Sequence, residues 1–347
     1  MNKTASIIPR SRHSEHAPAW RRELAAAVTR ADELLALLGL PAEPAAEAAA
    51  GLFGLRVPRG FIARMRPGDR HDPLLLQVLP QAAEGAATPS GYGPDPLDEA
   101  AAMVVPGLLH KYRGRVLLTL TGACGVHCRY CFRRHYPYAE ANPGGSHWPA
   151  TLDYIAANAD ITEVILSGGD PLSLGDTRLA ALCTDLAAIP HLRRLRIHSR
   201  LPVVLPARIT PGLLETLAGG RLGAVLVVHA NHPNEIDTRV RQALRQTAAA
   251  GVPVLNQAVL LRGINDRADT LCALSEVLFE AGALPYYLHQ LDRVQGAAHF
   301  EVPDAEAIAL MTELRARLPG YLVPRLVREQ ADAPAKTPLP AEGALYS

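Results

Sequence analysis

The chain has 347 residues, of which 48% are hydrophobic and 20% charged, and its formal net charge at pH 7 is +1. This composition supports a large core and excludes a disordered chain. The near-neutral charge, without a long basic run, gives no reason to expect nucleic acid or a membrane surface as a partner, so we expect a small-molecule substrate. The polar start, Met1 to Arg12, and the absence of an apolar run of about 18 residues predict a cytoplasmic protein.

The first hundred residues predict a mostly helical segment. Apolar side chains recur at helical spacing through residues 19–39 and stop at Gly39, which predicts one amphipathic helix. Residues 81–98 are rich in Ala, Gly and Pro and have little apolar periodicity, so they predict a loop.

Beyond residue 100, short apolar runs alternate with helical stretches. This alternation predicts an α/β fold with a parallel sheet and crossover helices. The expected strands are Val116–Leu120, Glu163–Leu166, Leu195–His198, Ala224–His229, Val254–Leu260 and Leu284–Gln290.

Polar residues that can take part in chemistry follow almost every expected strand. The candidates are Cys124, Ser167, Ser199, His229, Gln257 and Asp292. Active sites of parallel barrels lie at the carboxyl ends of the strands, so this placement favours a six-stranded partial (β/α)6 barrel over an open doubly wound sheet. We therefore expect three parts: an N-terminal segment with a flexible loop (1–100), a partial barrel (101–330) and a C-terminal tail (331–347).

Three of the five cysteines, Cys124, Cys128 and Cys131, form a C-x3-C-x2-C loop after the first expected strand. The odd number and the clustering argue against a disulfide framework. Three thiolates can hold three irons of a [4Fe–4S] cluster and leave the fourth iron open. The alternative is a structural zinc site, for which His127 or His135 could supply a fourth ligand.

This loop resembles the cysteine motif of the radical S-adenosylmethionine superfamily, which follows the first strand of a partial barrel. In that superfamily the open iron binds S-adenosylmethionine, whose reductive cleavage yields a 5′-deoxyadenosyl radical. Ser167, Gly168, Gly169 and Asp170 resemble the motif that contacts the methionine amino group, although such a glycine pair is also common in simple turns.

Four further residues at strand ends are expected to line the same cofactor pocket. They are Ser199, His229, Asn231 and Gln257. For His229, a core histidine bonded to the backbone is the alternative.

The resemblance narrows to the lysine 2,3-aminomutase family, a group of isomerases, and it runs from about Pro106 to Pro338. The matching stretches are Pro106–Leu108, Cys128–Arg134, Ser167–Asp170, Pro202–Pro206, His229–Pro233, Asn256–Asp266, Asp292 with Gly296–Phe300, and Lys336–Pro338.

This resemblance implies a pyridoxal phosphate site. Lys336 matches the lysine that bonds to the cofactor, whereas without the resemblance it would be interpreted as a solvated lysine in a tail. Lys111 and Arg115 match two cations that hold the phosphate, and both residue types suit that role. The glycine run that precedes the cofactor lysine in the family is replaced here by residues 332–335, Asp-Ala-Pro-Ala.

The resemblance also implies a substrate site. Arg133 matches the arginine that binds the substrate α-carboxylate, with Arg134 as the alternative. Asp292 matches one of two acids that bind the ε-ammonium of lysine. The position of the second acid falls on Glu329, which is longer by one methylene, and Asp332 is the alternative.

Residues 291–300 and 321–329, together with a short C-terminal part, resemble the bacterial aminomutases that serve elongation factor P. Those enzymes isomerise (S)-α-lysine to (R)-β-lysine, which a separate ligase attaches to the factor. The resemblance implies L-lysine as substrate and an electron donor such as flavodoxin or ferredoxin. No structural zinc is expected, because Cys183 and Cys272 lie in expected helices as core residues.

Three alternatives remain open at this point. A metabolic lysine or glutamate 2,3-aminomutase would share the cofactor motifs, although glutamate would require cations where Asp292 and Glu329 stand. A radical enzyme without pyridoxal phosphate would not need Lys336. A non-enzymatic protein would hold zinc or a passive cluster at the cysteines.

Overall fold

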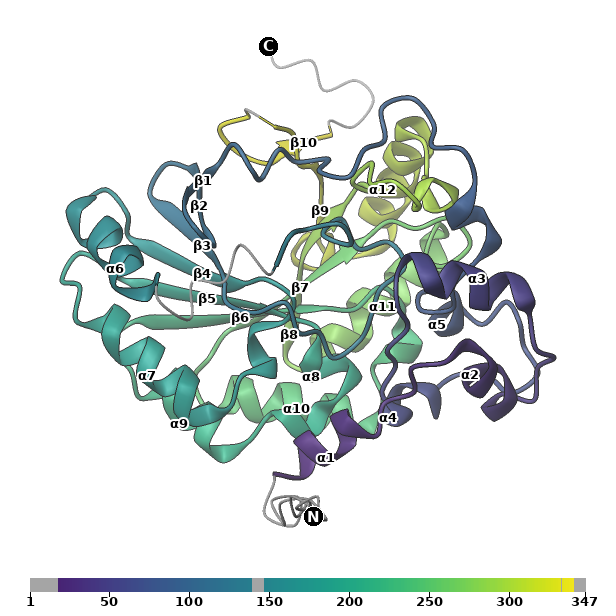
Figure 1. The fold of residues 1–347 in the computed structure, drawn as a ribbon, viewed down its shortest axis with the longest axis horizontal. Helices are drawn as coiled ribbons and strands as arrows, with labels where there is room; N and C mark the ends of the chain where they lie inside the picture. Colours follow the sequence, from purple (N-terminus) through teal and green to yellow (C-terminus); the bar gives the residue numbers. More distant parts are fainter. Residues whose placement is uncertain (1–17, 139–146, 332, 340–347) are drawn as a thin grey trace, which may run out of the picture.

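The computed structural model describes residues 18–138, 147–331 and 333–339. Its strands form one sheet in which spatial order follows chain order (Figure 1). The strands are β1 (Met103–Val105), β2 (Leu108–Tyr112), β3 (Arg115–Thr119), β4 (Glu163–Ser167), β5 (Arg194–Ser199), β6 (Gly223–His229), β7 (Val254–Val259), β8 (Ala283–His289), β9 (Arg325–Arg328) and β10 (Thr337–Pro338).

The six expected strands are confirmed as β3 to β8, and all of them run parallel. β9 adds a seventh parallel strand beside β8, whereas β1, β2 and β10 pair antiparallel at the two ends of the sheet. The strands curve into an open arc with helices on its outer side (Figure 1), so the expected partial barrel is also confirmed.

Helices precede the sheet and connect its parallel strands. They are α1 (Ala19–Ala25), α2 (Ala31–Leu37), α3 (Pro44–Leu52), α4 (Arg59–Ile62), α5 (Pro73–Leu76), α6 (Trp148–Ala157), α7 (Asp176–Ala187), α8 (Leu201–Val204), α9 (Pro211–Ala218), α10 (Thr238–Ala249), α11 (Ala268–Glu280) and α12 (Asp304–Arg317). Within the described ranges, no helix combines the length and the apolar character needed to cross a membrane.

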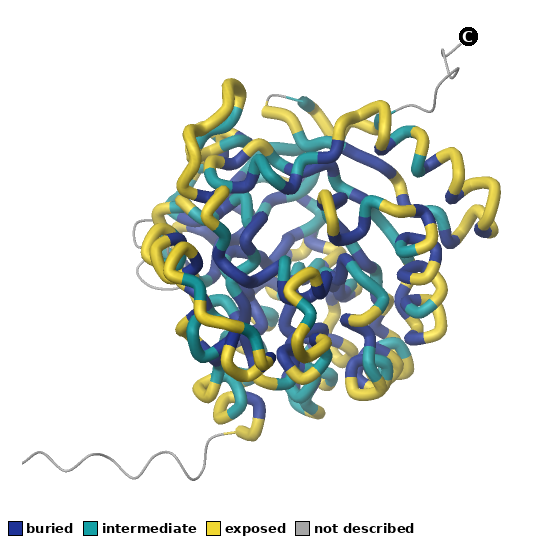
Figure 2. Tube along the Cα trace, turned by 90° about the vertical axis from the view of Figure 1, so that its right-hand side faces the viewer, coloured by how far each residue is buried: buried dark blue, intermediate teal, exposed yellow. Residues whose placement is uncertain are grey.

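The two faces of the sheet differ in chemistry. Leu166 of β4 and Ile197 of β5 are buried in the main hydrophobic core, which the outer helices complete. Neighbouring residues on a strand point to opposite faces, so Glu163 and Arg196 lie on the inner face, where their side chains form an ion pair of 2.9 Å. Figure 2 shows buried residues through the middle of the molecule and exposed residues on its outer turns. The layer between the sheet and the outer helices is therefore apolar, whereas the inner face carries charged side chains among apolar ones.

The single helix expected over residues 19–39 is wrong, because α1 and α2 are separate helices. Between them, Val28 pairs with Val57, and each backbone N–H donates to the other residue's carbonyl at 2.8 and 2.9 Å. The side chain of Arg59 also donates to the carbonyl of Ala26 at 3.1 Å. These long-range bonds replace the hydrogen bonds that would continue the helix.

A buried carboxylate contributes to the contact between the N-terminal segment and the cysteine loop. Glu84 lies in a 3-10 helix, Ala82–Gly85, inside the expected loop of residues 81–98. Its oxygens accept hydrogen bonds from Arg129 Nε at 2.8 Å and from Arg134 Nη2 at 2.6 Å, and all three side chains are at most 2% exposed. The division of the chain into three parts remains a prediction, since the main core takes residues from before and after residue 100.

We expect Glu84→Gln to lower the free energy of unfolding by about 3–5 kcal/mol, because it leaves two buried guanidinium groups without their counter-charge. Urea unfolding followed by circular dichroism measures this change. Glu306→Gln is the control, because Glu306 pairs with Arg262 at the surface and its loss should have little effect. Equal unfolding midpoints for both variants would contradict the role of Glu84.

Candidate active site

Cys124, Cys128 and Cys131 lie on the loop that follows β3, at the carboxyl end of the parallel strands, and all three are partly buried. Burial, together with the neighbouring Cys131, raises the pKa of Cys124, and burial with the neighbouring Cys128 raises the pKa of Cys131 to about 12. The three thiols are therefore close enough to influence one another. A metal centre must displace their protons when it binds.

The geometry does not favour the zinc alternative. His127 Nδ1 lies 2.8 Å from the carbonyl oxygen of Gly54, and His135 Nε2 lies 3.4 Å from that of Gln295. In the part of the chain that is described, no three His, Cys, Asp or Glu side chains surround a point where a single metal ion could sit. A [4Fe–4S] cluster binds each cysteine through a different iron, so the three loop thiols fit a cluster better than one ion.

Gly168 and Gly169 pack their backbone against the start of the cysteine loop. Gly168 has a φ of +117°, and a Cβ added there would lie 2.7 Å from the carbonyl oxygen of Thr121. A Cβ added at Gly169 would lie 2.5 Å from that of Ala123. The backbone N–H of Gly169 donates a hydrogen bond to the carbonyl oxygen of Thr121 at 2.6 Å. Glycine is needed here because the two loops touch.

Asp170 and Ser199 hold two strand ends together. The Ser199 hydroxyl donates to Asp170 Oδ1 at 2.7 Å, and the backbone N–H groups of Arg200 and Leu201 donate to Oδ2 at 2.8 and 3.0 Å. Burial raises the pKa of Asp170. These contacts position the loops after β4 and β5, and the cofactor contacts expected of both residues remain predictions.

His229 ends β6 and Asn231 follows it, whereas Gln257 lies within the neighbouring β7 and pairs with His229 in register. His229 Nε2 lies 2.8 Å from the hydroxyl of Tyr130, within the cysteine loop. Asn231 is fully buried and donates to Tyr130 at 2.7 Å and to Gln77 at 3.0 Å. Asn231 thus stabilises the protein around the expected cofactor pocket.

Arg133 is held by an unexpected partner, Glu99. Its Nε and Nη2 donate to the two carboxylate oxygens of Glu99 at 2.7 and 2.6 Å, and its Nη1 donates to the Ser167 hydroxyl at 3.0 Å. The bidentate edge expected to bind a substrate carboxylate is therefore occupied in this state. A substrate carboxylate must use the remaining N–H of Nη2 or displace Glu99.

The amine of Lys336 meets the carboxylate of Glu329. Glu329 directly follows β9, and the antiparallel pairing of Thr337 with Arg328 brings Lys336 back beside it. The two side chains form an ion pair with a hydrogen bond and are 19% and 17% exposed. Asp332, the alternative to Glu329, lies outside the described residues.

Lys111 and Arg115 belong to the same cluster. Lys111 Nζ lies 3.5 Å from Glu329 Oε1, and the Tyr112 hydroxyl donates to that oxygen at 3.0 Å. The Arg115 guanidinium lies 4.5 Å from the centre of the Tyr112 ring. The structure therefore brings Lys111 to the same carboxylate as Lys336, whereas Arg115 contacts Tyr112, a neighbour of that carboxylate.

The two expected ammonium ligands differ in protonation. Burial opposes ionisation of Glu329, but the ammonium of Lys336 prevails and lowers the pKa of Glu329 to about 2. Burial and the nearby charge of Glu329 raise the pKa of Asp292 to about 7. Glu329 is thus a fixed anion in this state, whereas Asp292 gains or loses its charge near neutral pH.

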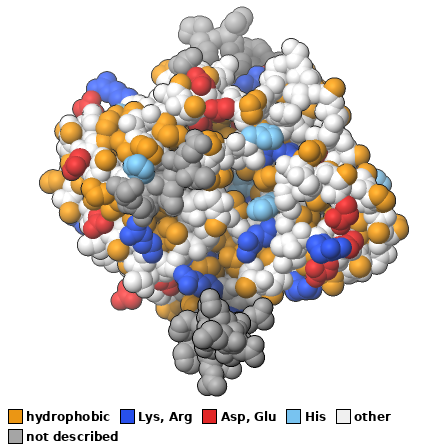
Figure 3. Space-filling model, in the orientation of Figure 1, with side chains coloured by type: hydrophobic (Ala, Val, Ile, Leu, Met, Phe, Trp, Pro, Cys, Tyr) orange, Lys and Arg blue, Asp and Glu red, His pale blue; other side chains and the backbone are white. Residues whose placement is uncertain are grey.

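Several side chains of this region escaped the sequence analysis. They are Glu99, Tyr112, His198, Arg200 and His289. Burial, and then nearby cations including Lys336, lower the pKa values of His198 and His289, the latter to about 3, so both are neutral at physiological pH. His198 is the last residue of the expected strand Leu195–His198, and His289 is the last but one of Leu284–Gln290. A histidine near the end of an expected strand is a signal that could have found them. Figure 3 shows histidine and basic side chains near the middle of one face, with acidic ones above them.

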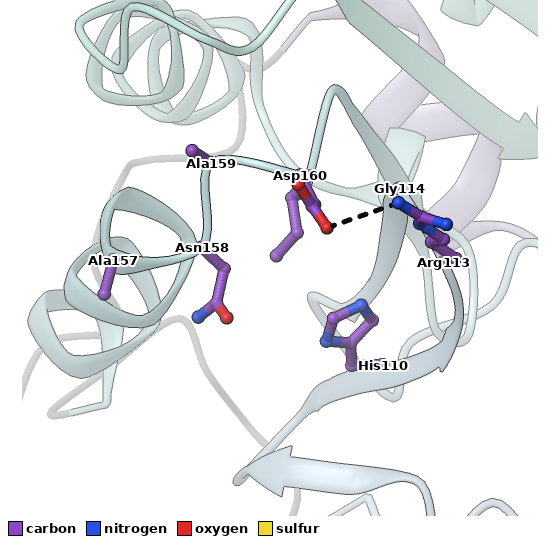
Figure 4. Close-up of a pocket in the computed structure, with 8 residues that line it drawn as sticks. His110, Arg113, Gly114, Ala157, Asn158, Ala159 and Asp160 are labelled. Carbon is purple, nitrogen blue, oxygen red and sulfur yellow. Dashed lines mark ion pairs between the residues drawn. The ribbon is translucent and has the colours of Figure 1, made fainter.

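A surface pocket of about 460 Å³ lies elsewhere, between the turn after β2 and the end of α6 (Figure 4). It is lined by His110 and Asn158, and by Arg113 and Asp160, which pair at 3.9 Å. None of the expected site residues lines this pocket.

Three proteins named L-lysine 2,3-aminomutase are similar to the chain. That of Escherichia coli (strain K12) is 54% identical over 92% of this chain and 94% of its own length. That of Haemophilus influenzae is 49% identical over 95% of this chain and 98% of its own length. That of Clostridium subterminale is 35% identical over 92% of this chain and 77% of its own length.

No protein-family model matches the chain. Among solved structures, Streptococcus suis SuiB bound to S-adenosylmethionine is 15% identical with a TM-score of 0.47, over 63% of this chain and 51% of SuiB. A radical SAM methyltransferase from Sphaerobacter thermophilus is 17% identical with a TM-score of 0.46, over 64% of this chain and 68% of that one. These two similarities are too distant to bear on function. The sequence matches at 54% and 49% identity extend over nearly the full length of both partners, and on this ground the chain belongs to the L-lysine 2,3-aminomutase family of isomerases.

Proposed function

We propose that this enzyme isomerises (S)-α-lysine to (R)-β-lysine with a [4Fe–4S] cluster, S-adenosylmethionine and pyridoxal phosphate. The family to which the chain belongs supports aminomutase chemistry on lysine. Cys124, Cys128 and Cys131 hold the cluster, and Lys336 bonds to pyridoxal phosphate. An electron donor of the flavodoxin or ferredoxin type supplies the reducing electron.

The observation that carries this proposal is the meeting of two lysines at one carboxylate. The whole chain contains three lysines, Lys3, Lys111 and Lys336, and the last two both contact Glu329. Glu329 contacts the amines of both Lys111 and Lys336, so a cofactor bonded to Lys336 would have Lys111 nearby as a ligand for its phosphate.

The charged side chains around Glu329 suggest how the site would recognise lysine. When Lys336 bonds to the cofactor, its ammonium no longer neutralises Glu329. Glu329 and Asp292 are then two neighbouring acids, and Glu329 keeps Lys111 as a partner. The ε-ammonium of a substrate lysine restores the balance, whereas the side-chain carboxylate of glutamate would increase the negative charge.

The chain's own residues hold the substrate at both ends. Arg133 binds the α-carboxylate and the two acids bind the ε-ammonium, so the carbon chain is stretched across the interior of the barrel. When bound, the cofactors supply the radical and the electron sink for the migrating amino group. The protein contributes orientation and the exclusion of water, because a fixed substrate reacts only at the carbon that faces the radical.

The resemblance of residues 291–300 and 321–329 to the enzymes that serve elongation factor P supports a role in modifying that factor. On this proposal the enzyme works in the cytoplasm and delivers free (R)-β-lysine to a ligase. The second candidate, a metabolic lysine 2,3-aminomutase, is consistent with the same site residues. The configuration of the product distinguishes the two roles.

Anaerobic reconstitution with iron, sulfide and pyridoxal phosphate, followed by S-adenosylmethionine, dithionite and L-lysine, tests the reaction. We expect (R)-β-lysine by chiral chromatography, and its complete loss in Cys128→Ala. Formation of (S)-β-lysine would favour the metabolic role. Formation of deoxyadenosine without any β-lysine would refute lysine as the substrate.

Borohydride makes the bond between a lysine amine and pyridoxal phosphate permanent, so peptide mass spectrometry can locate it. We expect the label on Lys336 and its loss in Lys336→Ala. Lys111→Ala is the matched control, because it should keep the label but need more cofactor to reach saturation. A label confined to Lys111 or Lys3 would contradict the assignment.

We expect the KM for L-lysine to fall as the pH rises through about 7, because Asp292 attracts the substrate ammonium only after losing its proton. Asp292→Asn should flatten this profile and raise the KM about tenfold or more at high pH, since a hydrogen bond to a charged group contributes about 1.5–3 kcal/mol. Asp269→Asn, which alters an outer ion pair with Arg317, should keep the wild-type profile. An unchanged profile in Asp292→Asn would exclude this role.

A further inference from the structure

A buried arginine contacts one of the three cysteines of the loop. Arg200 Nη1 donates to Cys128 Sγ at 2.6 Å. Arg200 follows β5 and is 7% exposed, so water does not screen its charge. Nothing in its position after the strand indicates this contact, because Cys128 lies 72 residues earlier.

The guanidinium is fixed from several sides. Its Nη2 donates to Gln77 Oε1 at 2.6 Å and to Glu235 Oε2 at 3.1 Å. The rings of Tyr130 and Phe61 lie 5.6 and 5.7 Å from its central carbon. Its backbone N–H is bound by Asp170, so the loop after β4 also sets its position.

Arg200 shares its counter-charge, Glu235, with other hydrogen-bond donors. Glu235 is fully buried, but its Oε1 accepts hydrogen bonds from the backbone N–H groups of Asn231 and His232, at 2.8 and 3.0 Å. Arg200 Nε is buried without a hydrogen-bond partner. A buried cation with one unpaired N–H therefore lies against a sulfur that is expected to bind iron.

We propose that Arg200 raises the reduction potential of the cluster through its contact with Cys128. This inference rests on the proposed function, since it takes the three cysteines to hold a [4Fe–4S] cluster. Gaining one electron makes the cluster more negative, and a nearby positive charge and a hydrogen bond to a ligand sulfur both stabilise that state. Arg200 acts on the cluster through Cys128 and does not touch the reacting atoms, so it is a positioning residue.

The test is a redox titration of the reconstituted enzyme without S-adenosylmethionine, with the reduced cluster quantified by electron paramagnetic resonance. We expect Arg200→Met to lower the ratio of reduced to oxidised cluster at a fixed potential about tenfold or more, which corresponds to a shift of about 59 mV for one electron. Arg200→Lys, which keeps the charge, should stay close to the wild type.

A second variant separates this effect from misfolding. Arg200→Met leaves Glu235 as a buried uncompensated anion, which destabilises the fold and also opposes reduction. In Arg200→Met/Glu235→Gln both charges are absent, so its midpoint potential should fall between those of Arg200→Met and the wild type. Arg208→Lys alters a buried arginine that pairs with Asp176, away from the cysteines, and is the control.

The outcomes distinguish this inference from the proposed function. Equal midpoint potentials in all variants, at equal iron and sulfide contents, would overturn the role of Arg200 and leave the cluster assignment intact. Failure of the wild-type protein to assemble a [4Fe–4S] cluster would overturn the proposed function itself. A more negative potential in Arg200→Met, restored in Arg200→Lys, supports the inference.

Discussion

The cysteine loop carries positive charges that cannot be left unpaired inside the protein. Arg129, Arg133 and Arg134 are buried or nearly so, and two carboxylates from the first hundred residues form ion pairs with them. Glu84 serves two of these arginines and Glu99 serves the third. A buried guanidinium without a counter-charge costs several kcal/mol, so the loop can adopt this conformation only with the N-terminal segment in place. The N-terminal segment is therefore part of the candidate active site.

The same pairing links the fold to substrate recognition. Glu99 accepts hydrogen bonds from Nε and Nη2 of Arg133, the edge of the guanidinium that is expected to bind a substrate carboxylate. It leaves only part of that guanidinium free for a substrate. Glu99 also raises the pKa of Asp292, although burial and Glu329 contribute more. A carboxylate from the N-terminal segment thus influences both ends of the proposed lysine site, and the charges of the site must be considered together.

Local sequence patterns predicted the parallel strands because each strand must place apolar residues against the helices at every second position. They did not predict the edges of the sheet. β10 has two residues, and β9 places two charged residues at its ends, so neither has a recognisable period. The break between α1 and α2 depends on Val57, a distant partner. The resemblance predicted roles for Lys336 and Arg133 from local motifs. Glu99 and Arg200 are defined by long-range contacts and left no local signal.

The interior of the barrel contains groups that could bind each end of a lysine, once the ion pairs of Arg133 with Glu99 and of Lys336 with Glu329 open. Arg133 and Arg200 lie beside the cysteine loop, and Asp292 and Glu329 lie beside Lys336. The cations suit the negative charge of thiolates and of a carboxylate, while the acids suit an ammonium group. L-lysine carries an α-carboxylate at one end and an ammonium at the other, so this arrangement favours one orientation of the substrate and opposes the reverse. Such a preference fixes the reacting carbon before any bond is broken, which supports positional selectivity in the proposed reaction.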